Sequence, residues 1–221
     1  MQILVMSCDK NRDLFYPFFH CMEKYWPNHP QINYSTETIR NPYYKTYSAN
    51  YSLDCWTKRV RDTVKQIKDD RIMLICDDFF IRNAPDVNTI ENRLIPEIKN
   101  NVAAVSFELS FDKNDLPYND ILLKRSPNGA YKTSVAGQIW NKDKLMRVFD
   151  CELDPWKFEY ANRHNNYDYL ILKDKLVIDW GHHKTGDKWG IFRNQWGKET
   201  AEFFKNEGLT IDFSQRGIYK E

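Results

Sequence analysis

Short runs of consecutive apolar residues alternate along the chain with segments whose apolar positions recur every three or four residues. Unbroken apolar runs bounded by polar residues are typical of strands that are buried on both faces of a sheet. They predict strands at residues 2–7, 72–76 and 102–107. A late strand is expected at residues 175–180, and the β-compatible segments 31–37 and 130–140 add two more.

Helices are predicted where apolar side chains fall on one face. Trp56, Val60, Val64 and Ile67 follow the spacing i, i+4, i+8 and i+11, which is a single helical stripe. Such a stripe most often packs on a core. Further helices are expected at residues 14–25, 87–99 with an end or a bend near Pro96, 141–149, from 154 onward and 199–206, with Ser52, Asn141 and Asp154 as N-cap residues.

The predicted strands and helices alternate, which favours an α/β fold with a mainly parallel central sheet and helices on both faces. Residues 41–47 are expected to form a loop, residues 110–128 a long polar excursion, and the basic tail after residue 206 a mobile end. Because no internal repeat or low-complexity linker occurs, one domain over residues 1–221 is the simplest organisation.

The strand at residues 72–76 runs directly into two acids, Asp77 and Asp78. In open α/β sheets, ligands bind beyond the carboxyl ends of the strands. Two neighbouring carboxylates repel each other, so they need a cation or hydrogen-bond donors to remain ionised. One interpretation is a divalent metal that carries a phosphorylated ligand. The alternative is a solvated strand end whose acids cap the following turn.

Charge and cysteine content remove some classes of function. The 32 Lys and Arg residues balance 31 Asp and Glu residues, so the net charge of +1 does not attract nucleic acid or an anionic membrane. Five cysteines without C-x-x-C spacing argue against a disulfide framework and against structural zinc. With no signal peptide and no membrane-spanning apolar run, we expect a soluble protein of a reducing, cytoplasmic compartment, the host cytoplasm if the source is viral.

The loop after the first strand has neither a G-x-G-x-x-G nor a G-x-x-x-x-G-K motif, so a dinucleotide fold and a P-loop are not indicated. A nucleotide here would be bound by side chains such as Asp9 and Arg12. A surface ion pair between these two residues is an equally good interpretation. Asp54, Trp56 and Arg59 lie at or near the start of the next helix, where the dipole and free N–H groups favour anions.

A second polar group follows the predicted strand at residues 175–180. His182, His183 and Lys184 stand between Gly181 and Gly186. Adjacent histidines are candidate metal ligands, and an exposed turn is the alternative. Both interpretations remain open from the residues alone.

The order of these motifs resembles the small nucleotide-sugar glycosyltransferases of the GT-A fold, which include enzymes of capsule and viral-surface glycan assembly. The resemblance spans about residues 2–197. It is carried by Ser7-Cys-Asp9, Cys76-Asp-Asp78, Gly137-Gln-Ile-Trp140, Asp154-Pro-Trp-Lys-Phe-Glu159 and the late Gly-His-His. The likeness implies a GT-A-like single domain that moves a sugar from a nucleotide sugar, with UDP-sugar favoured, to a glycan or glycoconjugate hydroxyl.

The resemblance also implies a metal site for Mn²⁺ or Mg²⁺. The acid pair matches the D-x-D position of the family, although its first acid is replaced by Cys76. Asp78 is then the leading metal ligand and Asp77 its partner, with His182 or His183 as a further ligand. Such a cation offsets the charge that develops on a diphosphate leaving group. Imidazole suits Mn²⁺ better than Mg²⁺.

The remaining roles follow from the same resemblance. Candidate donor-site residues are Ser7, Cys8, Asp9, Arg12, Trp56, Arg59 and Asp77, with Lys184 and Arg193 beside the phosphates. Glu159 is the first choice for the base that an inverting transferase needs, and Asp154 is the second. An N-cap role is a strong alternative for Asp154. Trp140 and Trp156 are candidate platforms for sugar rings, with core packing as the alternative.

Two other classes of function compete with the transferase. A metal-dependent phosphohydrolase or nuclease would use Asp77, Asp78 and the two histidines to activate water. A non-catalytic carbohydrate-binding module would use the aromatic residues, which make up 15% of the chain. The nearly neutral net charge argues against a nuclease or any other protein that binds nucleic acid.

Overall fold

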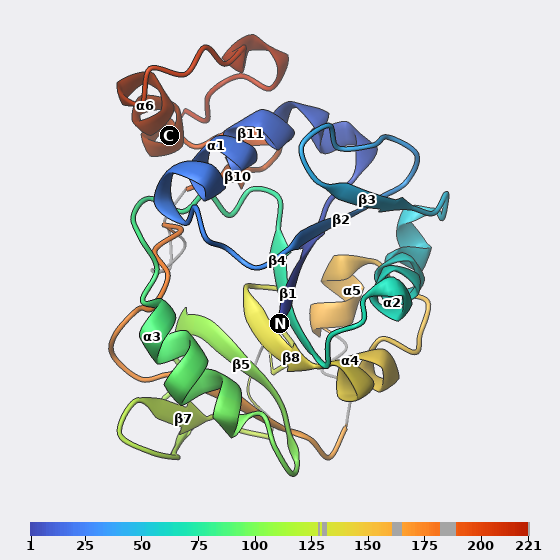
Figure 1. Ribbon diagram of the computed structural model, residues 1–221, viewed down its shortest axis with the longest axis vertical. Helices are drawn as coiled ribbons and strands as arrows, with labels where there is room; N and C mark the ends of the chain where they lie inside the picture. Colours follow the sequence, from blue (N-terminus) through green and yellow to red (C-terminus); the bar gives the residue numbers. More distant parts are fainter. Residues whose placement is uncertain (128, 130–131, 161–164, 182–188, 221) are drawn as a thin grey trace.

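The acid pair follows a strand near the middle of a large sheet in the computed structural model (Figure 1). The structure describes residues 1–127, 129, 132–160, 165–181 and 189–220. Within these residues, nine strands form one sheet in the order β3-β2-β1-β4-β8-β5-β9-β7-β6. Only β8 and β7 run against the direction of the other seven described strands. The prediction of an α/β fold with a mainly parallel sheet is confirmed.

The strands of this sheet are β1 (Gln2–Met6), β2 (Ile32–Thr36), β3 (Lys45–Ser48), β4 (Arg71–Cys76), β5 (Val102–Leu109), β6 (Leu116–Pro117), β7 (Leu122–Lys124), β8 (Gln138–Asn141) and β9 (Asp168–Leu172). A separate hairpin consists of β10 (Ile191–Phe192) and β11 (Gln195–Trp196). The helices are α1 (Phe15–Tyr25), α2 (Trp56–Gln66), α3 (Val87–Thr89), α4 (Lys142–Val148), α5 (Pro155–Tyr160) and α6 (Lys198–Asn206). Shorter 3-10 turns are η1 (Asp9–Leu14), η2 (Leu53–Cys55), η4 (Ile95–Glu97) and η5 (Phe213–Gln215), and η3 (Ile90–Leu94) is a π-type turn.

Helices cover both faces of the sheet, as the sequence predicts. Side chains alternate along β1, so that Ile3 and Val5 join one hydrophobic cluster while Leu4 and Met6 join another. The first cluster contains residues of α1 and α6, and the second contains residues of α2, α4 and α5. Figure 1 shows α2, α4 and α5 grouped together, away from α1 and α6.

Several local predictions are confirmed. The Asn141 side chain accepts a hydrogen bond from the Lys144 N–H at 3.0 Å and caps α4. The predicted helix ends near Pro96, since it passes from α3 through η3 into η4, whose last residue is Glu97.

The late strand was predicted at the wrong position. Residues 175–180 are not in the sheet, and the strand is β9 (Asp168–Leu172), which pairs with β5 on one side and β7 on the other. Val177 and Trp180 are nonetheless buried. Residues 177 and 179 instead accept backbone hydrogen bonds from Asp86 and Arg82. Burial and strand pairing are therefore separate properties of an apolar run.

The loop and tail predictions need correction too. Residues 45–48 form the edge strand β3 instead of a loop, and the polar excursion at residues 110–128 contains the β6–β7 pair. The tail is packed against the domain. Its backbone bonds to β11, because the Trp196 N–H donates to the Gly217 carbonyl and the Tyr219 N–H donates to the Trp196 carbonyl. Among the described helices, none combines the length and apolar character that a membrane crossing requires.

Glu207 joins the end of α6 to α1. Its carboxylate accepts hydrogen bonds from Lys24 Nζ at 2.5 Å and Tyr25 Oη at 2.8 Å, and it contacts His20 Nε2 at 3.0 Å. Burial acts to raise the pKa of Glu207, but these three partners outweigh it and lower the pKa to about 2. The ionised carboxylate therefore stabilises the folded state.

We expect Glu207→Gln to lower the free energy of unfolding by roughly 2 kcal/mol at pH 7. A lowered pKa means that the stabilisation is complete above the ordinary value of 4.5 and is lost as the pH falls towards about 2. Urea unfolding at pH 7 and pH 3 measures the difference between the two proteins, which should shrink at pH 3. Glu202→Gln, at an exposed position of α6, is the control. A difference that stays constant with pH would contradict the role of the charge.

Candidate functional site

The ends of β1 and β4 bring the first loop to the acid pair. The two strands are parallel neighbours with Met6 opposite Cys76, so the residues that follow them meet at one edge of the sheet. Ser7 Oγ donates a hydrogen bond to Asp77 Oδ2 at 2.5 Å, and Asn11 Nδ2 donates to Asp77 Oδ1 at 3.1 Å. Asp77 is thus held by both of its oxygens.

Asp77 is only 3% exposed. Burial and the charge of Asp78 raise the pKa of Asp77 to about 7, against the opposing effect of the hydrogen bonds from Ser7 and Asn11. A positive charge placed beside the two acids would favour their ionised forms. This part of the site is therefore electrostatically suited to a cation.

Asp78 lies between the end of β4 and the β10–β11 hairpin. Its Oδ2 accepts a hydrogen bond from the Ile191 N–H at 3.3 Å. The hairpin turns at Arg193 and Asn194, whose φ angles of 49° and 64° fit a tight two-residue turn of type I′. Arg193 is exposed at this turn, with its guanidinium 5.4 Å from the centre of the Phe192 ring.

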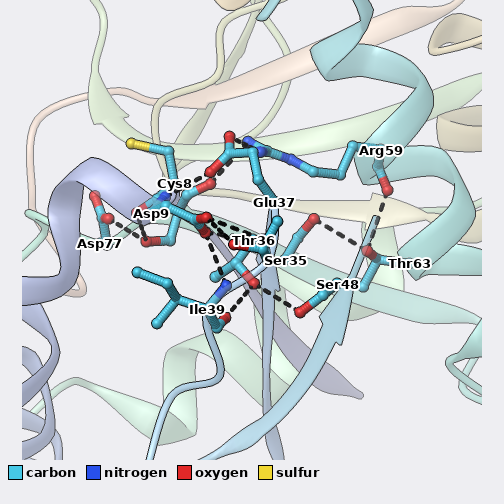
Figure 2. A network of polar contacts seen from close by, with 12 residues as sticks. Cys8, Asp9, Ser35, Thr36, Glu37, Ile39, Ser48, Arg59, Thr63 and Asp77 are labelled. Carbon is cyan, nitrogen blue, oxygen red and sulfur yellow. Dashed lines mark hydrogen bonds and ion pairs between the residues drawn. The ribbon is translucent and has the colours of Figure 1, made fainter. Parts of the chain in front are cut away.

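The first loop is fixed by a polar network that Figure 2 shows. The Asp9 carboxylate accepts hydrogen bonds from the Thr38 N–H at 2.9 and 3.1 Å, the Thr38 hydroxyl at 2.5 Å and the Ile39 N–H at 3.0 Å. Burial acts to raise the pKa of Asp9, but these bonds outweigh it and lower the pKa. Asp9 therefore ties the loop after β1 to the loop after β2.

Arg59 supports the same loop from α2. It is 3% exposed, forms an ion pair with Glu37, and donates from Nη2 to the Ser7 carbonyl at 2.8 Å (Figure 2). Glu37 in turn accepts a hydrogen bond from the Asp9 N–H at 2.5 Å. Burial and the nearby Asp77 charge raise the pKa of the Cys8 thiol, which favours its neutral form. The structure thus brings Ser7, Cys8, Asp9, Arg59 and Asp77 together.

Two other predicted donor residues take no part in this network. Arg12 is on the exposed side of η1. Trp56 is 5% exposed and packs against Phe149 and Phe158, with ring centres 5.6 and 5.9 Å away. Its prediction as a nucleotide contact is wrong, because the indole fills the core. The predicted ligands His182, His183 and Lys184 lie outside the described residues.

Glu159 is connected to the end of β4 through one residue, Val135. Its Oε1 accepts hydrogen bonds from the Val135 N–H at 2.8 Å and from Ser134 Oγ at 3.1 Å. The Val135 carbonyl accepts from Cys76 Sγ at 3.9 Å, and Cys76 directly precedes the acid pair. Burial raises the pKa of Glu159, although these hydrogen bonds oppose the shift.

Asp154 caps α5. The carboxylate accepts from the Lys157 N–H at 2.7 Å and forms an ion pair with the Lys157 ammonium at 3.1 Å. The hydrogen bond from the Lys157 N–H lowers the pKa of Asp154. The N-cap alternative is therefore the role that its contacts describe.

The two tryptophans predicted as sugar platforms differ completely in their exposure to solvent. Trp140 has no exposed surface and packs against Phe149 and Tyr169, so the platform prediction is wrong for this residue. Trp156 is 60% exposed on α5, and Tyr160, one helical turn further, is 72% exposed. An exposed indole retains an accessible ring face.

Sequence reasoning missed Glu108 and Arg125. Burial raises the pKa of Glu108 to about 7, with Arg125 opposing the shift and Glu159 adding to it. Arg125 is 6% exposed. It also borders a cavity of about 10 Å³, which has room for about one water molecule. The sequence contained a feature that indicates Glu108, since the apolar run of β5 is followed by an acid, as the apolar run of β4 is.

The described part of the chain holds no cluster of three His, Cys, Asp or Glu side chains that is suited to a metal ion. Asp78 is partly buried and lies beside Asp77, and its carboxylate can supply a hard oxygen ligand to a metal ion. Mg²⁺ and similar ions are often bound by one or two carboxylates together with substrate phosphates. The donor set fits a cation that arrives with a diphosphate.

No protein-family model matches the chain, and no curated protein matches its sequence. Solved structures resemble it in shape. TarS of S. aureus has a TM-score of 0.52 at 12% identity, over 80% of this chain and 36% of that one. A cytidylyltransferase of Leptospira borgpetersenii has a TM-score of 0.50 at 9% identity, over 80% of this chain and 76% of that one.

The bifunctional IspDF of Campylobacter jejuni is also similar, with a TM-score of 0.48 at 11% identity, over 79% of this chain and 50% of that one. The chain therefore spans half the length of IspDF and about a third of TarS. At such identities the likeness concerns the fold. The chain has the GT-A-like fold, which glycosyltransferases and nucleotidyltransferases share.

Proposed function

We propose that the protein is a glycosyltransferase that moves a sugar from a nucleotide-diphosphate sugar to a hydroxyl of a glycan acceptor. A UDP-sugar is the favoured donor. The observation that carries the proposal is the meeting of two acidic groups at one strand end. Asp77 and Asp78 follow β4 directly, and Glu159 reaches the same strand end through Val135. One acidic group suits the leaving diphosphate and its cation, and the other suits the attacking hydroxyl.

On the donor side, the loop of residues 7–12 lines the nucleotide. Ser7 and Asn11 hold Asp77 in position, and Asp9 and Arg59 keep the loop folded against β2 and α2. The role of Asp9 and Arg59 is thus to shape the nucleotide site, since their charged groups are already hydrogen-bonded or ion-paired to other residues of the chain. Arg12 and Arg193, both exposed, are available to phosphate oxygens.

A bound Mn²⁺ or Mg²⁺ would offset the negative charge that develops on the departing diphosphate. Asp78 would hold this ion and Asp77 would support it, with His182 or His183 and Lys184 as further candidates from the sequence. Asp77, fixed by Ser7 and Asn11, keeps its carboxylate beside Asp78. The chain's own contribution is the carboxylate of Asp78 with the fixed carboxylate of Asp77 beside it.

On the acceptor side, Glu159 removes the proton from the attacking hydroxyl. Ser134 and Val135 orient its Oε1, and its raised pKa suits a base that works nearer neutral pH. A base beside the acceptor corresponds to transfer with inversion, in which the hydroxyl attacks from the face opposite the diphosphate. Trp156 and Tyr160, exposed on α5, offer ring faces for the acceptor sugar.

A thermal-shift panel tests the donor half of the proposal. The protein is melted with UDP, CDP, GDP and ADP, each with and without MnCl₂, because a ligand that binds only the folded state raises the melting temperature. We expect a rise of several degrees with UDP that needs Mn²⁺. No response to any of the four nucleotides would overturn the proposal and favour the carbohydrate-binding module.

The products separate the transferase from the remaining enzyme classes. A glycosyltransferase releases UDP from a UDP-sugar in proportion to acceptor, whereas a phosphohydrolase or nuclease releases phosphate or nucleotides from simple esters without an acceptor. A nucleotidyltransferase, which shares the fold, releases pyrophosphate from CTP. Release of UDP that depends on acceptor is the outcome we expect.

A further inference from the structure

Arg216, near the end of the chain, is buried against the first loop. Its side chain is 5% exposed and forms a forked pair with Asp13, from Nε at 2.7 Å and from Nη2 at 2.7 Å. Nη2 also donates to the Lys10 carbonyl at 3.1 Å, and Nη1 donates to Asn194 Oδ1 at 3.0 Å. One guanidinium therefore joins the tail, the loop after β1 and the hairpin turn.

Asn11 extends this contact to the acid pair. Its Oδ1 accepts from Arg216 Nη2 at 2.9 Å, and its Nδ2 donates to Asp77 Oδ1 at 3.1 Å. Because the two ends of one amide are used, the bond from Arg216 determines which end faces Asp77. A rotated amide would direct an oxygen at the carboxylate instead of a donor.

The tail is anchored firmly enough to act on the loop. Phe213 packs edge-on against the buried Trp196 at 5.4 Å, and Tyr219 packs against Phe192 at 4.8 Å. The Gly217 N–H donates to the Phe213 carbonyl at 2.8 Å and closes the turn that presents Arg216. The contact between the tail and the loop therefore joins two ordered parts of the fold.

We propose that the C-terminal segment 209–219 is a component of the donor site, in which Arg216 is a positioning residue that orients the Asn11 amide towards Asp77. The inference rests on the proposed function for its consequence, nucleotide binding, but the orientation of Asn11 can be tested alone. A lysine cannot replace Arg216, because one ammonium does not reproduce a planar fork to Asp13 together with bonds to Asn11 and Asn194.

The first test measures the Kd of UDP with MnCl₂ by calorimetry, at a temperature where every variant is folded. We expect Arg216→Lys and Arg216→Gln each to weaken binding roughly tenfold or more, since hydrogen bonds to charged groups are lost or misdirected. Asn11→Ala should weaken it to a similar degree. The double variant Arg216→Gln/Asn11→Ala should be no weaker than Asn11→Ala, because the two residues act as a unit.

Arg61→Lys is the matched control, since Arg61 also pairs with a distant aspartate, Asp150, but links α2 to the turn after α4. It should leave the Kd unchanged. Wild-type affinity in Arg216→Lys would overturn the inference, because charge alone would then suffice. Additive effects of Arg216→Gln and Asn11→Ala would overturn it as well.

The second test needs no nucleotide and separates this inference from the proposed function. In ¹⁵N-labelled protein, the side-chain amide resonances of Asn11 should shift in Arg216→Gln and stay in place in Arg61→Lys. If they shift while the wild-type protein binds none of the nucleotides, the proposed function fails and the positioning role stands. If they do not shift, the positioning role is wrong whatever the protein binds.

Discussion

Asp78→Asn is expected to reduce sugar transfer by about a thousandfold or more while leaving the fold intact, because a neutral amide holds a divalent cation poorly and several kcal/mol of transition-state stabilisation are lost. The structure predicts little effect on folding. Asp78 is partly buried, and the hydrogen bond that its Oδ2 accepts from the Ile191 N–H can also be accepted by an amide oxygen. Initial rates of UDP release and the melting temperature measure the two effects.

The control for Asp78→Asn is Asp120→Asn. Asp120 pairs with Arg93 at the surface, at a distance of 2.5 Å, so its loss should change neither the rate nor the melting temperature by much. The Mn²⁺-dependent rise in melting temperature with UDP should disappear in Asp78→Asn alone. A variant that keeps more than about a tenth of the wild-type rate would contradict the role of Asp78 in charge stabilisation.

The central strands were predictable because their signal is local. β1 and β4 are runs of apolar residues with polar residues at both ends, and neither needs a partner to be recognised. The late strand was not predictable in this way. Residues 169–172 and 176–178 are both apolar and both largely buried, and only the free edge of β5 decides which of them joins the sheet. That edge is a property of the tertiary fold.

The same distinction applies to the site. The acid pair could be found because it directly follows an apolar run, and Glu108 could have been found by the same reasoning. Arg216 could not, because its partner Asp13 lies 203 residues earlier in the chain. A basic residue in a polar tail has no local feature that distinguishes a buried guanidinium from a solvated one.

The tryptophans show where residue type misleads. Trp140 and Trp156 are chemically equal candidates for a sugar platform, yet one has no exposed surface and the other is 60% exposed. Trp140 lies in β8 in the interior of the sheet, and its ring packs against Phe149 and Tyr169 in the core. Trp156 lies on the short helix α5, whose apolar contact with the core is made by Phe158. Position in the fold, which composition does not contain, decides the role.

Glu159→Gln is expected to lower the rate of transfer by roughly a hundredfold to ten-thousandfold without changing the Kd of UDP, because it removes a general base from the acceptor side. The glutamine carbonyl still accepts hydrogen bonds from Ser134 and Val135, so the local structure is retained.

The pH dependence of the rate gives Glu159 a second readout. Since burial raises the pKa of Glu159, and a base works only when deprotonated, the wild-type rate should fall as the pH drops through that raised pKa. The fall should be absent from the residual activity of Glu159→Gln. Glu152→Gln is the matched control, because Glu152 is exposed and pairs with Lys58 at 3.6 Å on the surface. Near-normal transfer in Glu159→Gln, or an unchanged acid limb, would remove Glu159 as the base and direct attention to Glu108, a neighbouring acid whose pKa is also raised by burial.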